Sequence, residues 1–106
     1  VRAAMSSLEG QAEMVIVDCL TLWVSNLMGA GASNEAILAE ARKLADVLVG
    51  ASFSSIVVTD EVGAGIVPEH PLARRFRDLL GWANQAAAAV ADEVILMVAG
   101  CPVRVK

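Results

Sequence analysis

Three short apolar runs constrain the fold of this chain most strongly. They are MVIVD at 14–18, SIVVT at 55–59 and EVILMVAG at 93–100. Continuous apolar runs of about four to eight residues, rich in β-branched side chains, are typical of strands buried on both faces of a parallel sheet. Because parallel strands need long crossover connections, the intervening sequence is expected to supply helices.

Helical periodicity fills the intervals between the runs. A first helix is predicted over 19–28, ending at Gly29 and Gly31. Ser33 or Asn34 can cap a second helix. The apolar stripe of that helix is Ile37, Leu38, Ala41, Leu44, Ala45, Leu48 and Val49. Pro71 suits the first turn of a third helix. Its apolar face is Leu72, Phe76, Leu79, Leu80, Ala83, Ala87 and Val90.

The resulting element order is β–α–α–β–α–β, with PVRVK at 102–106 as a short edge piece. This order predicts an α/β fold, in which helices flank an open, mostly parallel sheet. No internal repeat, low-complexity tract or linker divides the chain, so residues 1–106 are predicted to form a single domain.

The composition is 57% hydrophobic, which is high for an average soluble domain. This fraction predicts two-sided burial, an oligomer interface, or a missing neighbour that covers apolar surface. The longest charge-free run, 19–34, is too short and too polar to span a bilayer. The first ten residues contain no apolar signal-peptide core. A cytoplasmic location is therefore expected.

Charge and cysteine content exclude two classes of site. The formal net charge is −4 and there is no basic tract, so nucleic acid is a poor candidate partner. Cys19 and Cys101 lie far apart, and with a single histidine no zinc-site spacing can be assembled. Both thiols are expected to be reduced and mostly buried.

Acidic residues follow the first two predicted strands, where α/β sheets bind their ligands. Asp18 ends the first run, a position at which nucleotide enzymes hold Mg²⁺; the alternative is a helix N-cap. Asp60 and Glu61 follow the second run. They could orient a nucleophile or accept a proton, or they could belong to a solvated turn or a cap.

The glycines of VTDEVGAGIVPEHP (58–71) do not form a dinucleotide fingerprint, because Pro68 occupies the position of its third glycine. Gly63 and Gly65 instead predict positive φ or a close backbone approach. His70 is interpreted as an exposed residue at a helix start, without a catalytic role. No G-x-x-x-x-G-K-[ST] phosphate loop occurs anywhere in the chain.

Two further groups of side chains could bind a ligand or could have a purely structural role. One group is Arg74, Arg75 and Arg77. These arginines could bind phosphate, but the simplest interpretation is that they form the solvent-exposed face of the third helix. Trp23 and Trp82 are interpreted as core or subunit packing rather than base-stacking residues.

Three blocks together resemble the bifunctional adenosylcobinamide kinase/adenosylcobinamide-phosphate guanylyltransferase family of cobalamin synthesis. They are VDCLTLWVSNLM (17–28), DEVGAGIVPEHPLARRFRDLLGWANQ (60–85) and ADEVILMVAGCPVRVK (91–106). The resemblance implies a RecA-like P-loop fold and a cytoplasmic enzyme, typically a homo-oligomer, that uses ATP or GTP with Mg²⁺. It also implies phosphorylation of adenosylcobinamide, then transfer of GMP from GTP through a guanylylated histidine.

The resemblance assigns roles to a few positions. Asp18 matches the Walker-B-like acid that meets the nucleotide and Mg²⁺. The family's N-E-V-G-x-G-I-V-P loop is matched by Glu61, Val62, Gly63, Gly65, Ile66, Val67 and Pro68. This loop is interpreted as shaping the substrate side of the site, with Glu61 as the candidate catalytic residue. Asp60 departs from the family, which usually has Asn there, and adds a charge near the substrate.

In the family, the P-loop and the guanylylated histidine lie upstream of the matched region, and His70 falls outside that histidine's motif. The chain therefore resembles the carboxyl-terminal part of the enzyme and is predicted to be inactive alone. The alternative is a catalytically dead α/β module retained for binding or oligomerisation. The DNA upstream of Val1 would separate these two hypotheses. A receiver-like domain with Asp18 as phosphoacceptor ranks last, because the acid pair and late lysine are missing.

Overall fold

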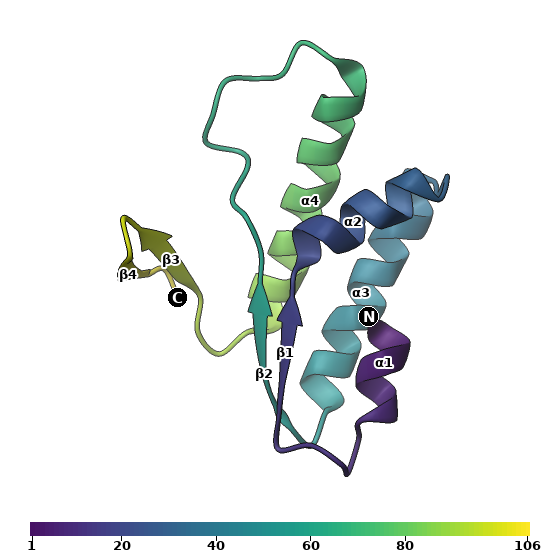
Figure 1. Ribbon diagram of the computed structural model, residues 1–106, viewed down its shortest axis with the longest axis vertical. Coiled ribbons are helices and arrows are strands. Elements are labelled where there is room, and N and C mark those ends of the chain that lie inside the picture. The colour runs from purple at the N-terminus through teal and green to yellow at the C-terminus, as the bar shows by residue number, and fades with distance from the viewer.

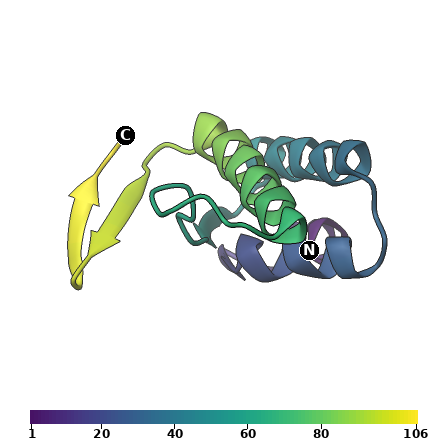
Figure 2. The same cartoon turned by 90° about the horizontal axis from the view of Figure 1, so that it is seen from above.

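The computed structural model describes all 106 residues. Helices pack beside a small parallel sheet, and a hairpin stands apart at the carboxyl end (Figures 1 and 2). The elements in chain order are α1 (Arg2–Ser7), β1 (Met14–Asp18), α2 (Leu20–Gly29), α3 (Asn34–Gly50), β2 (Ser54–Val58), α4 (Pro71–Val90), β3 (Ile95–Val98) and β4 (Cys101–Arg104). No helix is long and apolar enough to cross a membrane.

The first two predicted strands pair in parallel, as the sequence indicates. Their register runs from Met14 opposite Ser54 to Asp18 opposite Val58. The carboxyl ends of β1 and β2 therefore meet at one edge of the sheet. Helix α2 and the connection 59–70 both begin at this edge (Figure 1).

The prediction of a third strand in the same sheet is wrong. β3 pairs antiparallel with β4 in a separate two-stranded sheet, with Val98 opposite Cys101. Ala99 and Gly100 form the two-residue connection with φ of 50° and 77°. Positive φ at both central residues is the geometry of tight hairpin turns whose twist matches that of the strands. The chain thus reverses within the predicted 93–100 run.

The core lies on one face of the parallel sheet. Val17 is only 7% exposed, whereas its neighbour Ile16 is 62% exposed. The prediction of strands buried on both faces is therefore wrong for this structure. Eleven buried residues form the core cluster: Met5, Val17, Leu20, Val24, Ile37, Ala41, Leu44, Phe53, Leu79, Leu80 and Ala83. The opposite face exposes Met14, Ile16, Ile56 and Val58.

Most residues of the predicted helical stripes are buried or packed against the core. Val49 and Leu72 are exceptions: they are 67% and 56% exposed, in the last turn of α3 and the first turn of α4. Trp82 is 47% exposed, so it is not a core residue, whereas Trp23 packs partly buried against the core.

The structure also shows an amino-terminal helix that the sequence patterns did not predict. Met5 of α1 is 3% exposed in the core, and Arg2 forms an ion pair with Glu40 of α3 at 3.4 Å. Lys43 pairs with the same carboxylate. The hydrogen bond from Lys43, and more weakly that from Arg2, lowers the pKa of Glu40 below its ordinary value. Buried Met5 and this ion pair hold α1 against the body.

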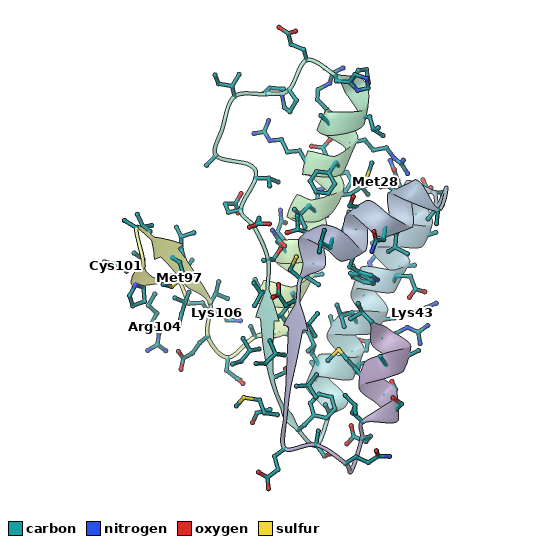
Figure 3. The ribbon with its side chains drawn as sticks, in the orientation of Figure 1. Met28, Lys43, Met97, Cys101, Arg104 and Lys106 are labelled. Atoms are coloured by element: carbon teal, nitrogen blue, oxygen red, sulfur yellow. The ribbon has the colours of Figure 1, made fainter.

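The last residue of the chain, Lys106, connects the segment that follows the hairpin to the end of α4. Lys106 Nζ donates to the carbonyl groups of Ala88 and Ala89 at 2.9 and 3.2 Å (Figure 3). A cation at a helix carboxyl terminus satisfies unpaired carbonyl groups and complements the helix dipole. No basic residue within α4 does this, so Lys106 supplies the charge from outside the helix.

Candidate functional site

The carboxyl ends of β1 and β2 carry the acidic residues that the sequence singled out. Asp18 closes β1, is exposed, and lies on the uncovered face because it follows buried Val17. The N-cap of α2 is Cys19, whose side chain makes no capping bond. The cap interpretation of Asp18 is therefore wrong. Asp18 forms no ion pair either, and its carboxylate is available to a ligand.

Asp60 is tied to the start of α2. Thr21 Oγ1 donates to Asp60 Oδ2 at 2.8 Å and accepts from the Asp60 backbone N–H at 3.1 Å. Asn84 of α4 reaches the same junction from the other side: Nδ2 donates to the Asp60 carbonyl at 3.0 Å, and Oδ1 accepts from the Thr59 hydroxyl at 2.6 Å. The structure thus joins the two strand ends by side-chain hydrogen bonds.

The sequence did not predict three residues of this group, namely Thr21, Thr59 and Asn84. Their polar character gave a weak signal in two places: Thr21 lies in the first turn of α2, after the acid of β1, and Asn84 and Gln85 interrupt an otherwise apolar segment of α4. Only the fold brings Thr21 and Asn84 to Asp60, from which they are separated by 39 and 24 residues.

Glu61 and Gly63 form a tight local turn. Glu61 Oε1 accepts from the Gly63 N–H at 2.7 Å. A Cβ at Gly63 would lie 2.9 Å from that oxygen, so the close neighbour of Gly63 is the Glu61 side chain rather than another strand. Positive φ is not the reason for either loop glycine, because the positive-φ glycines are Gly10, Gly31 and Gly100. Gly65 has open space around it.

The three arginines lie at the surface of α4, with Arg74 exposed and Arg75 and Arg77 half-buried, and each also makes specific hydrogen bonds. Arg77 Nη2 donates to the Gly63 carbonyl at 2.6 Å, and Arg74 Nη1 donates to the carbonyl groups of Pro68 and Glu69. Arg75 donates to Asn34 Oδ1 and to the Ala32 carbonyl at 2.6 and 2.7 Å. These bonds fix the backbone of the 59–70 connection and of the segment before α3.

His70 has a structural role at the start of α4. Its Nδ1 accepts from the Leu72 N–H at 3.1 Å and caps the helix. Its ring also lines a hollow of about 480 Å³ between α2 and α4. The other residues around this hollow are Ser25, Met28, Gly29, Leu72, Ala73 and Phe76. The hollow adjoins the far end of the 59–70 connection.

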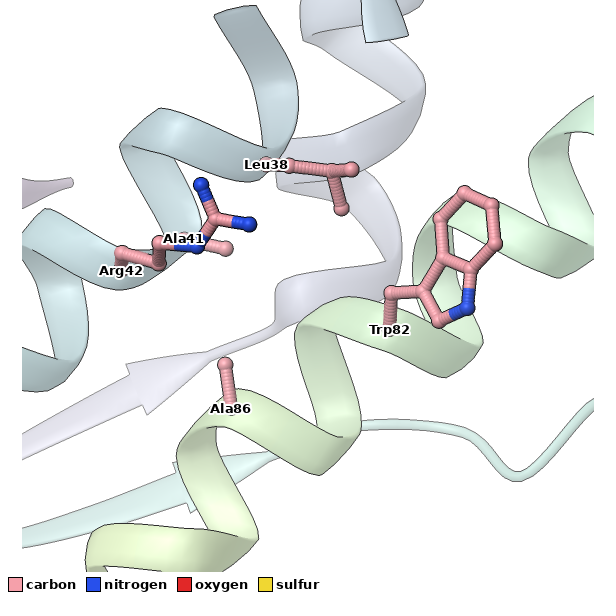
Figure 4. Close-up of a pocket in the computed structure, with 5 residues that line it drawn as sticks. All are labelled: Leu38, Ala41, Arg42, Trp82 and Ala86. Carbon is pink, nitrogen blue, oxygen red and sulfur yellow. The ribbon is translucent and has the colours of Figure 1, made fainter. Parts of the chain in front are cut away.

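A second hollow of about 300 Å³ lies between α3 and α4 (Figure 4). It is lined by Leu38, Ala41, Arg42, Trp82 and Ala86. None of these residues belongs to the hydrogen-bonded group at the strand ends, so this hollow is not the candidate site. That group consists of Thr21, Thr59, Asp60 and Asn84.

Comparison with known proteins decides the family. The model of the cobinamide kinase / cobinamide phosphate guanyltransferase family matches residues 1–105. The chain belongs to this family. Among its relatives is the bifunctional adenosylcobalamin biosynthesis protein CobU of Escherichia coli K12, which is 40% identical over 89% of this chain and 59% of its own length. CobU of Salmonella typhimurium LT2 is 41% identical, and CobP of Pseudomonas aeruginosa PAO1 is 36% identical over 98% of this chain.

The family resemblance inferred from the three sequence blocks is therefore confirmed. This member of the cobinamide kinase / cobinamide phosphate guanyltransferase family spans only 59–61% of the length of these relatives. The structure confirms α/β architecture with a small parallel sheet. The RecA-like arrangement remains an expectation from the resemblance.

The donor groups at the strand ends fit Mg²⁺ of the kind that nucleotide enzymes use. No three His, Cys, Asp or Glu side chains come together into a protein-only metal site. Mg²⁺ needs no such cage, since it commonly takes one or two carboxylates, with waters and substrate phosphates as the remaining ligands. Asp18 offers one exposed, unpaired carboxylate.

The two thiols are free, but the prediction that they are mostly buried is wrong for Cys101, which is exposed.

Proposed function

We propose that this chain provides the carboxyl-terminal part of a bifunctional enzyme of cobalamin synthesis. The enzyme phosphorylates adenosylcobinamide with ATP or GTP and then transfers GMP from GTP to the phosphorylated product. Family membership supports the reaction class. The single observation that supports the location is the Thr21–Asp60 hydrogen bond, which joins the ends of two parallel strands. Open α/β sheets bind ligands at such ends.

In this proposal Asp18 meets the nucleotide. Its exposed carboxylate would hold Mg²⁺ directly or through water, with nucleotide phosphates as further oxygen ligands. Bound Mg²⁺ would neutralise charge on the transferring phosphoryl group. The role of Asp18 is to fix that charge at the carboxyl edge of β1.

The 59–70 connection forms the substrate side. Glu61 is the candidate general base: one carboxylate oxygen holds the Gly63 N–H, which leaves Oε2 for the aminopropanol hydroxyl of adenosylcobinamide. Asp60 keeps its second carboxylate oxygen free for a ligand, because Thr21 engages only Oδ2. The neighbouring side chain of Ile66 is 97% exposed, and Val67 is 60% exposed. These apolar groups are available to a bulky ligand.

The remaining parts of the active site come from outside these residues. The chain contains no phosphate loop, so the phosphate cradle and the guanylylated histidine are supplied by another segment of the enzyme. The exposed apolar face of β1 and β2 supports this arrangement, since Ile16 and Ile56 are 62% and 48% exposed there. The chain alone is expected to be inactive, and the complete enzyme to be a cytoplasmic homo-oligomer.

A Mg²⁺–GTP titration tests the assignment of Asp18. The protein is expressed from the complete reading frame that contains these residues, as wild type, Asp18→Asn and Asp46→Asn. Asp46 is a matched control because it is an exposed aspartate on α3. We expect Asp18→Asn to weaken binding about tenfold or more with Mg²⁺ and to have no effect in excess chelator. Equal affinity of all three proteins would refute the metal role, and no nucleotide binding by the wild type would favour the binding-module alternative.

A further inference from the structure

The connection between β2 and α4 is long and irregular, yet it has almost no apolar anchor. None of residues 59–70 is buried, and only Val62 packs against the core as a partly buried hydrophobic. Loops of this length without secondary structure are uncommon in compact domains and are usually functional. Their shape must then be set by polar contacts.

Those polar contacts come from one face of α4. Asn84 donates to the Asp60 carbonyl, Arg77 to the Gly63 carbonyl, and Arg74 to the carbonyl groups of Pro68 and Glu69. The spacings of seven and three residues place the three donors on one side of the helix. The contacts cover about 15 Å of helix axis. The loop therefore runs antiparallel to α4 and is bound to it at its start, middle and end (Figure 1).

The acceptors are all backbone carbonyl groups of the loop. These bonds to carbonyl groups fix the path of the main chain and leave the side chains of Ile66 and Val67 without a role in holding the loop. Ile66 and Val67 accordingly remain exposed, and Glu61 keeps one free carboxylate oxygen. A loop that is held by its backbone and presents its side chains is preorganised for a ligand.

Asn84 differs from the two arginines because it uses both ends of its amide. Nδ2 donates to the Asp60 carbonyl, while Oδ1 accepts from the Thr59 hydroxyl at 2.6 Å. A donor and an acceptor on one short side chain are needed to hold two consecutive residues in this way. Aspartate has the same size but would place two acceptors against the Asp60 carbonyl and add a charge beside the Asp60 carboxylate.

We propose that Asn84 is a positioning residue that fixes the start of the 59–70 loop, and that the α4 face bearing Arg74, Arg77 and Asn84 holds this loop preformed for adenosylcobinamide. The ligand assignment rests on the proposed function. Asn84 does not touch the substrate in this account; it acts through Asp60 and Glu61.

The test compares Asn84→Asp with Gln85→Glu, which makes the same amide-to-carboxylate change at an adjacent exposed position of α4 without a hydrogen-bond partner to lose. The first measurement is the ¹⁵N order parameter of the Gly65 amide. We expect about 0.85 in the wild type and in Gln85→Glu, falling below about 0.6 in Asn84→Asp. A wild-type value already below about 0.6, or no change in Asn84→Asp, would overturn the proposal.

The second measurement is steady-state kinetics of the enzyme from the complete reading frame. We expect Asn84→Asp to raise the KM for adenosylcobinamide about tenfold while the KM for the nucleotide stays within about twofold. Unchanged kinetics, or an equal rise in both constants, would refute a positioning role on the substrate side. If the wild type turns over neither substrate, the proposed function fails, and the order parameters still decide whether Asn84 holds the loop.

Discussion

Replacing Thr21 with valine removes the hydroxyl group that joins the carboxyl ends of β1 and β2. Valine keeps the β-branched shape and a similar helix propensity, so the change is confined to hydrogen bonding. Two bonds are lost: the 2.8 Å bond to Asp60 Oδ2 and the 3.1 Å bond from the Asp60 N–H.

The magnitude follows from the exposure of the pair. A hydrogen bond to a charged partner contributes about 1.5–3 kcal/mol and a neutral one about 0.5–1.5 kcal/mol. Asp60 is exposed, so water replaces much of what is lost, and we expect a net destabilisation of about 1 kcal/mol. For a domain of this size that corresponds to a fall in Tm of about 4–8 °C.

Urea denaturation followed by circular dichroism measures this difference, with Thr21→Ser as the control that keeps the hydroxyl. A double-mutant cycle with Asp60→Ala isolates the pair. We expect Thr21→Ser to resemble the wild type and the two single changes to be non-additive. If Thr21→Val is as stable as the wild type, or if its effect adds fully to that of Asp60→Ala, the strand ends are not joined by this bond.

Two further predictions concern the core and the amino-terminal helix. Leu80→Ala should destabilise the fold by about 3 kcal/mol or more, since Leu80 is fully buried. Leu72→Ala, at a 56% exposed position, should destabilise it by less than about 1 kcal/mol. Chemical denaturation of both variants measures the two losses, and equal losses would contradict the assigned core. Glu40 should titrate below its ordinary pKa, and Lys43→Met should move that pKa upward, as followed by NMR of the Glu40 carboxyl group. Because the folded-state pKa is lowered, the contribution of Glu40 is present at neutral pH and is lost as pH falls through that lowered value. An unchanged pKa in Lys43→Met would exclude the Lys43 hydrogen bond as its main cause.

Local patterns predicted α2, α3, α4 and the parallel pair of strands, but not α1. The first run was predicted over 14–18 and forms β1 over Met14–Asp18, because a short β-branched run admits few other structures. Ser33 accepts from the Ala36 N–H as the predicted cap of α3. Such features depend on neighbours within a few residues.

Features that depend on long-range contacts were not predictable. The apolar residues of the run 93–100 predict a strand, but they do not show whether it pairs with the parallel sheet or, after a turn at Ala99 and Gly100, with β4. Likewise, the two outward-facing rows of β1 and β2 have the apolar composition of buried strands but face no partner. Such composition agrees with the proposal that another segment of the enzyme covers this face.

The candidate site was half predictable for the same reason. Asp18 and Asp60 follow strand-like runs, so their place at the sheet edge could be predicted from the sequence. Asn84 lies within α4 beside Gln85, and nothing in the local sequence shows which of the two amides has a long-range partner. Its role depends on how α4 crosses the end of β2, and the same geometry turns Arg74 and Arg77 from solvent-facing charges into contacts with the loop.

The most direct test of the central claim is product formation by the enzyme from the complete reading frame. Mass spectrometry of a reaction with adenosylcobinamide, GTP and Mg²⁺ measures the phosphorylated and GDP-linked products in wild type, Asp18→Asn and Asp46→Asn. The account predicts both products from wild type and Asp46→Asn, and a loss of about a hundredfold or more in Asp18→Asn. Turnover by Asp18→Asn within about twofold of the wild type would contradict the placement of the active site at the carboxyl ends of β1 and β2.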